Sequence, residues 1–531
     1  MKTILTEASL DFAREHITAF YDTDFYPKPF EYRALWFYWE DVKRHLLSTP
    51  LAQSFSGPPR AIAWPKARGG YRVVHQLEPL DSIVYVALVH AVAPEISESR
   101  MGPDVACSYR INVDRSSFFV GGSGFSRYRQ QCEKLSAEYK YVLTTDISDF
   151  YNQIYLHRVC NAIELVSDTK SAGTEIERFI TRLNNKASQG IPVGPAPSVV
   201  LAEAVMMDVD QHIAHQGFDH VRYVDDIRIF SDSKADLERC LESLVIYLHD
   251  AHRLNVVGEK TAVKTTTEFM HAELQNQYQL EKLDFLRSIE IANPYGEQAY
   301  SDDEDGDDDD DEDEGEDEDG GDDDDDDERS TGEKLLVALT RAHKSGMVDL
   351  AVIRAIIRRA KAGHIPDLAP YLLSEIDFFA PAANDVALYL ASLPPWYEKD
   401  FVEDLRDACA DGKMEKQCIR VWMEWLFSQR KTFMKDRVLR GFVNGGEVAS
   451  QALAAVTTSN VAWAKSAKSK VLSSASWDRR AYIYALSLLA SDERGPFIRQ
   501  LLQNAALTVT DKWVANWVEK GCPEASPFIP F

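Results

Sequence analysis

An acidic run divides this chain into two parts. Residues 302–328 comprise 23 Asp or Glu side chains and four glycines, with no other residue type. Such a segment has no apolar surface to bury and its like charges repel, so it cannot join a hydrophobic core. The sequence therefore predicts an extended, disordered acidic linker over residues 301–330, between two folded parts.

The charge outside this run is close to balanced. Of the 85 acidic side chains, 62 lie elsewhere, against 58 basic ones, so the formal net charge of −27 is concentrated in one segment. Nucleic-acid binding depends on where basic side chains cluster rather than on their total. The composition therefore does not exclude a nucleic-acid-binding protein.

The two parts differ in their hydrophobic patterns. Residues 1–60 predict an N-terminal helical extension. Residues 61–300 mix short β-rich runs with helical segments, which is typical of an α+β domain. Residues 331–531 contain successive amphipathic helices, which predict HEAT-like helical repeats, with an irregular helical bundle as the alternative. At 531 residues, 45% of them apolar, the chain is large enough for several buried cores.

The cysteines and the N-terminus indicate a cellular compartment. Seven cysteines are scattered without a CxxC pair, which favours free thiols in a reducing cytoplasm over a zinc site or a disulfide framework. The first twenty residues carry charges that the core of a signal peptide would not tolerate. The longest apolar run, residues 82–94, is too short to cross a bilayer. We expect a soluble, cytoplasmic protein without a membrane partner.

Two segments of the α+β part place carboxylates at strand ends. Asp146 ends the β-branched run that begins at Leu143, and two short β-rich runs flank the pair Asp225 and Asp226. The pair predicts a hairpin with both carboxylates at its tip, although either segment could also be an ordinary turn. The neighbouring runs are apolar, so the repulsion between adjacent acids costs free energy that a bound divalent cation would offset.

A third segment, residues 188–198, is rich in glycine and proline and leads into a predicted helix over residues 199–209. Glycines at this density let the backbone approach a ligand closely. By itself this segment would only mark the start of a helix, and a functional role for it depends on the two aspartate-containing segments.

Together these segments resemble motifs A, B and C of the reverse transcriptase superfamily, in order and in separation. Motif A is matched by Asp146–Ile154, motif B by Gln189–Pro192 and motif C by Tyr223–Asp226. Residues 254–261 resemble motif D, and residues 65–72 resemble the basic fingers segment. The resemblance implies a right-hand polymerase with fingers and palm, here followed by an all-α helical-repeat domain.

This resemblance implies an RNA-directed DNA polymerase, in which a primer 3′-hydroxyl attacks the α-phosphate of a dNTP. The implied catalytic residues are Asp146, Asp225 and Asp226. Together with the backbone carbonyl of Ile147 they would hold two Mg²⁺ ions, or Mn²⁺ in their place. Asp226 is expected to position the site more than to ligate a metal ion.

The resemblance also implies a dNTP-binding set. Lys66 and Arg72 would clamp the triphosphate, unless they are only solvated charges, and Lys260 is a candidate acid for the departing pyrophosphate. Gln189 is expected against the sugar or base. Tyr151 stands five residues after the motif A aspartate, where RNA polymerases usually carry a second aspartate that accepts the ribose 2′-hydroxyl. Its ring would fill the space of that hydroxyl, which predicts selectivity for dNTPs.

The helical part narrows the resemblance to bacterial abortive-infection and other defence-associated reverse transcriptases of the "unknown group" lineages. The resemblance implies antiphage DNA synthesis with RNA as template or associated non-coding RNA, and it leaves protein-primed and template-independent synthesis open. A homo-oligomer or a partner defence protein is an expectation from resemblance only. The alternatives are a domesticated, retron-like enzyme that copies a cognate non-coding RNA, and a scaffold with a vestigial palm. The acidic run is either a linker or a nucleic-acid mimic.

Overall fold

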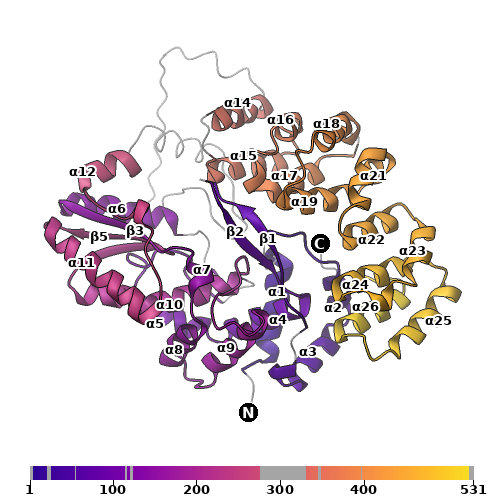
Figure 1. The fold of residues 1–531 in the computed structure, drawn as a ribbon, viewed down its shortest axis with the longest axis horizontal. Coiled ribbons are helices and arrows are strands. Elements are labelled where there is room, and N and C mark those ends of the chain that lie inside the picture. The colour runs from indigo at the N-terminus through magenta and orange to yellow at the C-terminus, as the bar shows by residue number, and fades with distance from the viewer. Residues whose placement is uncertain are drawn as a thin grey trace, which may run out of the picture.

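The computed structural model describes most of both parts of the chain, and Figure 1 shows their arrangement. The predicted acidic linker, residues 301–330, lies outside the described residues. The described ranges are 4–20, 25–53, 56–67, 69–113, 117–119, 124–274, 331–344, 348–395 and 397–525.

A four-stranded antiparallel sheet forms the palm. Its strands run in the order β4 (Asp219–Tyr223), β5 (Asp226–Ser231), β3 (Tyr141–Asp146) and β6 (Ala262–Thr265). Three of these strands cover β-rich runs that the sequence analysis predicted, and the α+β prediction is confirmed.

Both faces of the palm sheet are covered by helices. Side chains alternate between the two faces along each strand, so neighbouring residues belong to different cores. Leu143 and Ile229 point into one core, which includes residues of α10 and α11. Val142 and Phe230 point into a second core, which includes residues of α6 and α12. The helices around the sheet are α4 Pro79–His90, α5 Ala93–Ser99, α6 Phe125–Glu138, α7 Phe150–Gln153, α8 Leu156–Val166, α9 Ala172–Leu183, α10 Ala196–His215, α11 Lys234–Tyr247 and α12 Thr266–Phe269.

A separate two-stranded hairpin, β1 (Arg60–Pro65) and β2 (Tyr71–Gln76), corresponds to the predicted fingers segment. One face of this hairpin packs into the core of the C-terminal helices through Trp64 and Val74. The indole N–H of Trp64 donates to the carbonyl oxygen of Pro381, 3.2 Å away. The hairpin therefore shares its core with the helical region rather than with the palm.

The C-terminal region is all-helical within the described residues, as predicted. Helices α15, α17, α19, α22, α24 and α26 each pack on the next, with the remaining helices outside them, so that the region forms the curved array on the right of Figure 1. This stacking is the kind of arrangement that HEAT-like repeats produce. The helices are α14 Thr331–Lys344, α15 Leu350–Ala362, α16 Ala369–Ser374, α17 Ala383–Ser392, α18 Glu398–Ala410, α19 Gln417–Ser428, α20 Lys431–Lys435, α21 Arg437–Asn444, α22 Val448–Thr457, α23 Val461–Ala467, α24 Ser476–Ala485, α25 Ser491–Leu502 and α26 Val509–Glu519.

The N-terminal extension joins the two parts. It contains α1 (Glu7–Phe20), α2 (Glu31–Phe37) and α3 (Trp39–Ser48); α1 packs on α4 and α2 packs on α26. Arg480 of α24, which is 1% exposed, pairs with Glu31 of α2 at 2.8 Å and with Glu78, just before α4, at 2.7 Å. One buried arginine thus connects three distant segments of the chain.

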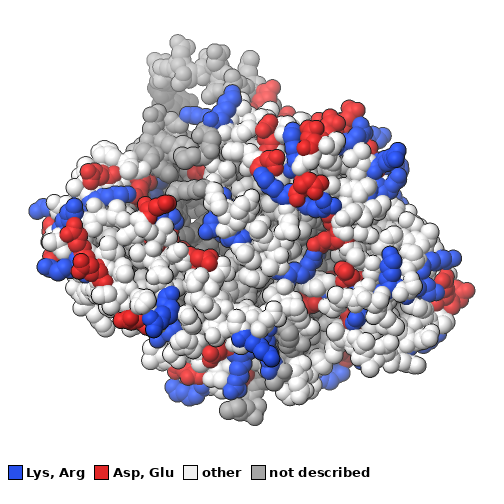
Figure 2. All heavy atoms as spheres, in the orientation of Figure 1, with Lys and Arg blue, Asp and Glu red and all other residues white. Residues whose placement is uncertain are grey.

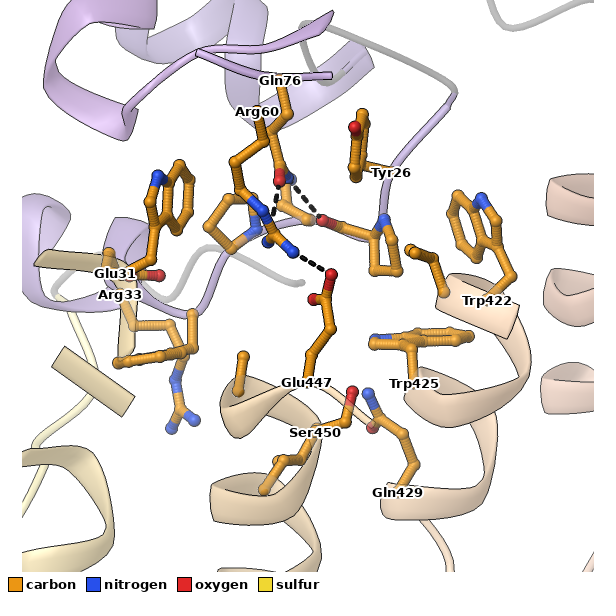
Figure 3. A pocket seen from close by; sticks show the side chains of 18 of the residues that line it. Tyr26, Glu31, Arg33, Arg60, Gln76, Trp422, Trp425, Gln429, Glu447 and Ser450 are labelled. Carbon is orange, nitrogen blue, oxygen red and sulfur yellow. Dashed lines mark hydrogen bonds and ion pairs between the residues drawn. The ribbon is translucent and has the colours of Figure 1, made fainter. Parts of the chain in front are cut away.

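A cavity of about 1130 Å³ lies at this junction, between the N-terminal extension, the fingers hairpin and the helical region (Figure 3). At its wall Arg60 lies between the rings of Tyr26 and Trp477, with the guanidinium carbon 5.7 Å and 5.3 Å from their centroids, and forms an ion pair with Glu447. None of the predicted polymerase residues lines this cavity.

Two surface properties bear on the partners of the protein. On the face shown in Figure 2, acidic and basic side chains are interspersed over the palm and the helical region, and basic side chains also lie where the two meet. In the described part of the chain no single helix is long and apolar enough to span a membrane. The pair α4 and α5, bent by 44°, passes the same test on length and composition alone, and most of α4 is buried in the protein core.

Candidate active site

Antiparallel pairing of β3 with β5 brings the predicted carboxylates together. Asp146, the last residue of β3, lies opposite Asp226, the first residue of β5. The amide of Ile147 donates to the carbonyl oxygen of Asp225 at 3.2 Å, which holds the end of β3 against the β4–β5 turn. The carbonyl oxygen of Asp146 accepts from the amide of Val257 at 2.8 Å. Three carboxylates from two distant segments therefore meet at one end of the palm sheet.

Asp225 carries the strongest electrostatic signal of the three. Burial raises its pKa to about 7, and the negative charges of Asp146 and Asp226 add to the shift, while Lys260 opposes it. A carboxylate in this position is costly to ionise without a neighbouring cation. Oxygen donors of this kind suit Mg²⁺ or Mn²⁺, so Asp146 and Asp225 fit a divalent cation.

Asp226 has a different environment. Its carboxylate is engaged by Arg228, with 2.5 Å between Nη1 and Oδ1, and Arg228 also contacts Glu273 at 3.2 Å. Burial raises the pKa of Asp226 and the pairing with Arg228 counteracts the rise. Across the described residues no group of three or more His, Cys, Asp or Glu is arranged to hold a metal ion. Two carboxylates are nevertheless enough where substrate phosphates and waters supply the other ligands of Mg²⁺.

Lys260 lies in a short 3₁₀ turn, Gly258–Lys260, that precedes β6. Its ammonium group forms an ion pair with the carboxylate of Asp146. The structure therefore brings the predicted motif D lysine to the predicted motif A aspartate, although its role as an acid stays a prediction.

Tyr151 belongs to the motif A segment and lies near Asp225, and Gln189 belongs to the motif B segment that is bonded to the helix of Tyr151. Burial raises the pKa of the Tyr151 hydroxyl well above its ordinary value, and Tyr109 and the nearby charge of Asp225 contribute. The carbonyl oxygen of Tyr151 accepts from the amide of Ile191 at 2.9 Å. The Gln189 amide donates to the side-chain oxygen of Gln153, on the same short helix as Tyr151, at 2.7 Å. The motif B loop is thus hydrogen-bonded to α7, beside the aspartates.

Of the two predicted fingers cations, Arg72 is electrostatically coupled to the site. Burial lowers the pKa of Arg72 and the charge of Arg354 on α15 lowers it further, whereas Asp225 and Tyr151 raise it. Arg72 therefore lies within electrostatic range of the catalytic carboxylate. Lys66 is exposed in the hairpin turn, and among the interactions of the described residues none joins it to the aspartates.

The hairpin is held to the motif B loop by its own hydrogen bonds. The amide of His75 donates to the carbonyl oxygen of Val193 at 2.9 Å, and the amide of Val193 lies 3.1 Å from Nδ1 of His75. These bonds keep β2 next to the palm even though its apolar face belongs to the helical core.

Sequence reasoning missed Arg228 and Arg354. Arg228 did carry a signal, because it interrupts the apolar run of β5 between Ile227 and Ile229, and a buried charge of this kind needs a partner. Arg354 carried none, since it acts on Arg72 through its charge and lies on α15, far along the chain in the helical region.

The chain was compared with protein families, curated proteins and solved structures. Residues 64–286 match the family model described as reverse transcriptase (RNA-dependent DNA polymerase). The solved structures similar to this chain include telomerase from Candida albicans in complex with a TWJ fragment of telomeric RNA, at 12% identity, TM-score 0.30, over 77% of this chain and 70% of that one. They also include apo telomerase from Candida tropicalis, at 10% identity, TM-score 0.32, over 76% and 73% of the chains. No curated protein matches the chain.

The palm sheet with its carboxylates and the family match define a nucleotidyltransferase of the polymerase class. More specifically, residues 64–286 form a reverse transcriptase domain, and the predicted resemblance to the reverse transcriptase superfamily is confirmed for these residues.

Proposed function

We propose that this protein is an RNA-directed DNA polymerase that adds dNTPs by two-metal nucleotidyl transfer. The observation that carries the proposal is the pair Asp146 and Asp225, held together at the end of β3 with the pKa of Asp225 raised to about 7. Divalent cations bound there would stabilise charge on the attacking 3′-oxygen and on the leaving pyrophosphate. The family match over residues 64–286 supports RNA and DNA as the partners.

The other side chains have roles that follow from their positions. Arg72, within electrostatic range of Asp225, would hold the triphosphate, and Lys260, at Asp146, would supply a proton to the departing pyrophosphate. The neutral ring of Tyr151 would exclude a ribose 2′-hydroxyl, and Gln189 would contact the sugar or base. Asp226, paired with Arg228, would orient the hairpin more than bind metal.

Primer extension by aspartate variants tests this proposal. Asp146→Asn and Asp225→Asn should each lower the rate about a thousandfold or more, since they remove the oxygens that hold the cations. Asp232→Asn is the matched control, because it removes one exposed charge just beyond the far end of β5. Wild-type rates in both catalytic variants would refute the proposal.

Sugar selectivity tests the role of Tyr151. Tyr151→Ala should incorporate ribonucleotides at a rate closer to that of dNTPs, whereas Tyr151→Phe keeps the ring and should keep the selectivity. Equal use of both nucleotides by the wild type would contradict the predicted role of this side chain.

We further propose that the polymerase acts in bacterial antiphage defence in the cytoplasm. The all-helical region in place of a thumb and maturase region supports this, through the resemblance to abortive-infection reverse transcriptases. Plaque assays with the wild type and Asp225→Asn test it: protection that needs Asp225 supports the proposal, and full protection by the variant would favour a scaffold. Sequencing of co-purified RNA and of the DNA product would show whether one cognate RNA is copied.

A further inference from the structure

The residue before the catalytic aspartate has an unfavourable backbone conformation. Val224, at the β4–β5 turn, has a φ of 57°, in the left-handed region that β-branched residues rarely adopt. A positive φ at the first central residue of a two-residue hairpin normally selects glycine. A valine therefore stays there only if the surrounding structure holds it.

The backbone amide and the backbone carbonyl of Val224 each form a hydrogen bond with a side chain outside the turn. Its amide donates to the hydroxyl oxygen of Ser108 at 3.0 Å, and its carbonyl oxygen accepts from Nη1 of Arg222 at 2.8 Å. The Ser108 hydroxyl in turn donates to Oε1 of Glu203 at 2.7 Å. The turn is thus bound to side chains that are not part of the hairpin tip.

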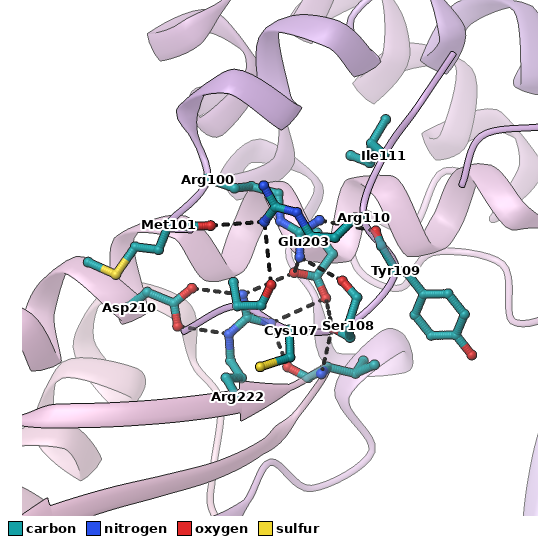
Figure 4. Close-up of polar contacts among 12 residues, drawn as sticks. Arg100, Met101, Cys107, Ser108, Tyr109, Arg110, Ile111, Glu203, Asp210 and Arg222 are labelled. Carbon is teal, nitrogen blue, oxygen red and sulfur yellow. Dashed lines mark hydrogen bonds and ion pairs between the residues drawn. The ribbon is translucent and has the colours of Figure 1, made fainter. Parts of the chain in front are cut away.

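These side chains form one buried network (Figure 4). Arg222 pairs with Glu203 at 3.0 Å and with Asp210 at 2.7 Å, and Arg100 pairs with Glu203 at 2.5 Å. The side chains of all four are at most 1% exposed. Glu203 and Asp210 stand seven residues apart on α10, so they share the face of that helix that points to β4.

The fold also determines where Ser108 lies. The segment 105–108 runs beside β4, with the Arg222 amide donating to the carbonyl oxygen of Val105 at 2.7 Å and the Cys107 amide donating to that of Arg222 at 3.0 Å. Gly124, with a φ of 77°, packs so closely on this segment that a Cβ would overlap the carbonyl oxygen of Cys107. Ser108 is therefore fixed by backbone contacts on both sides.

We propose that Ser108, Arg222 and Glu203 are positioning residues, which hold Val224 in its left-handed conformation and so place the carboxylate of Asp225 opposite Asp146. The inference rests on the proposed polymerase function. On its other side Asp225 is held by the amide of Ile147, so the network completes the support of this residue.

The charges of the network are stable. Burial alone would raise the pKa of Glu203, but Arg100 and Arg222 lower it overall, so the carboxylate remains ionised and keeps accepting hydrogen bonds. Its partners are paired in the same way, which favours a rigid support over a titrating group.

The experiment uses Ser108→Ala in the full chain, because Arg222→Ala would remove the arginine that pairs with both buried carboxylates, Glu203 and Asp210, and should prevent folding. Ser108→Ala should lower kcat in primer extension about tenfold or more while the KM for dNTP changes less than twofold, since the nucleophile and metal site lose alignment but the nucleotide contacts stay. Ser428→Ala is the matched control: its buried hydroxyl makes one hydrogen bond, to the carbonyl oxygen of Trp425, in the helical region.

A double variant separates positioning from general stability. Glycine adopts a positive φ without steric cost, so Val224→Gly should restore kcat of Ser108→Ala to within about twofold of the Val224→Gly single variant. Loss of activity in Ser108→Ala with no such recovery would overturn the inference.

A second readout does not depend on polymerisation. Hydrogen exchange of the Val224 amide in the full chain should accelerate about tenfold or more in Ser108→Ala and stay unchanged in Ser428→Ala. An unaltered exchange rate with an unaltered kcat would overturn the inference. An inactive wild type with accelerated exchange in the variant would refute the proposed function while supporting the network.

Discussion

Two buried arginines of this protein form the same kind of ion pair with carboxylates but connect different parts of the structure. Arg222 in the palm and Arg480 in the helical region are at most 1% exposed, and each pairs with carboxylates at 2.7–3.0 Å. The carboxylates hydrogen-bonded to Arg222 lie 12 and 19 residues away in the chain, whereas those hydrogen-bonded to Arg480 lie 402 and 449 residues away. The first network orients one turn of one domain, and the second joins segments of different parts. The sequence distance between partners, not the type of bond, distinguishes their roles.

The largest expected effect concerns the long-range network. Arg480→Ala leaves Glu31 and Glu78 buried without a counter-charge, which should lower the free energy of unfolding by about 3–5 kcal/mol. Urea unfolding followed by tryptophan fluorescence, together with limited proteolysis, measures the change.

Arg499→Ala is the control for this comparison, because its ion pair with Glu519 is exposed and worth less than about 1 kcal/mol. If Arg480→Ala unfolded at the same urea concentration as Arg499→Ala, the junction would not depend on the buried network.

An effect of intermediate size on stability is expected at Asp225, which is buried beside the negative charges of Asp146 and Asp226. The pKa of Asp225 is about 7 in the folded chain and about 4 in an unfolded one. The folded state therefore binds the extra proton more tightly, so this group makes the free energy of unfolding fall as pH rises from about 4 to about 7. In a chelator at pH 8, Asp225→Asn should be more stable than the wild type by on the order of 1–3 kcal/mol.

Thermal unfolding against pH checks this prediction. The difference should shrink as pH falls below 7 and disappear near pH 4, and added Mg²⁺ should stabilise the wild type but not the variant. A constant difference across this pH range would mean that Asp225 ionises freely in the folded protein.

The smallest effect is expected where the two regions meet. Arg354 and Arg358 of α15 each contact Asp385 at 3.0 Å, and the positive charge of Arg354 lowers the pKa of Arg72. A triphosphate held by Arg72 would offset that repulsion, so Arg354→Ala should raise the KM for dNTP about three- to tenfold. Arg358→Ala is the matched control and should change it less than twofold. Equal changes in both variants would show that the helical region does not contribute to the nucleotide site.

Much of the palm could be predicted from the sequence because its signals are local. Asp146 and Asp225 each border an apolar β-run, so the strands, the hairpin and the meeting of the carboxylates follow from short segments. The family resemblance supplied the relation among those segments. The same resemblance implied Lys260 as a nucleotide-site residue, but its ion pair with Asp146 was not predicted.

The supporting contacts could not be predicted in the same way. Glu203 lies within a largely apolar helix and Arg222 within the polar strand Asp219–Tyr223, so the sequence does not show which partner either of them has. The packing of Trp64 on the helical region could not be predicted either. Its partner Pro381 lies 317 residues away in the chain, and the apolar residues of the strand would be compatible with burial against any apolar surface.

The shared core of the fingers hairpin has a mechanical consequence. In antiparallel pairing Trp64 and Arg72 lie opposite each other and point to the same face, which is the face that packs on the helices. If the hairpin moved relative to the palm while the helical region stayed in place, Trp64 and Val74 would leave the helical core and become exposed to water. Bending of the helical array would therefore move the guanidinium of Arg72 with it, so the proposed binding of a triphosphate by Arg72 would depend on the curvature of helices far along the chain.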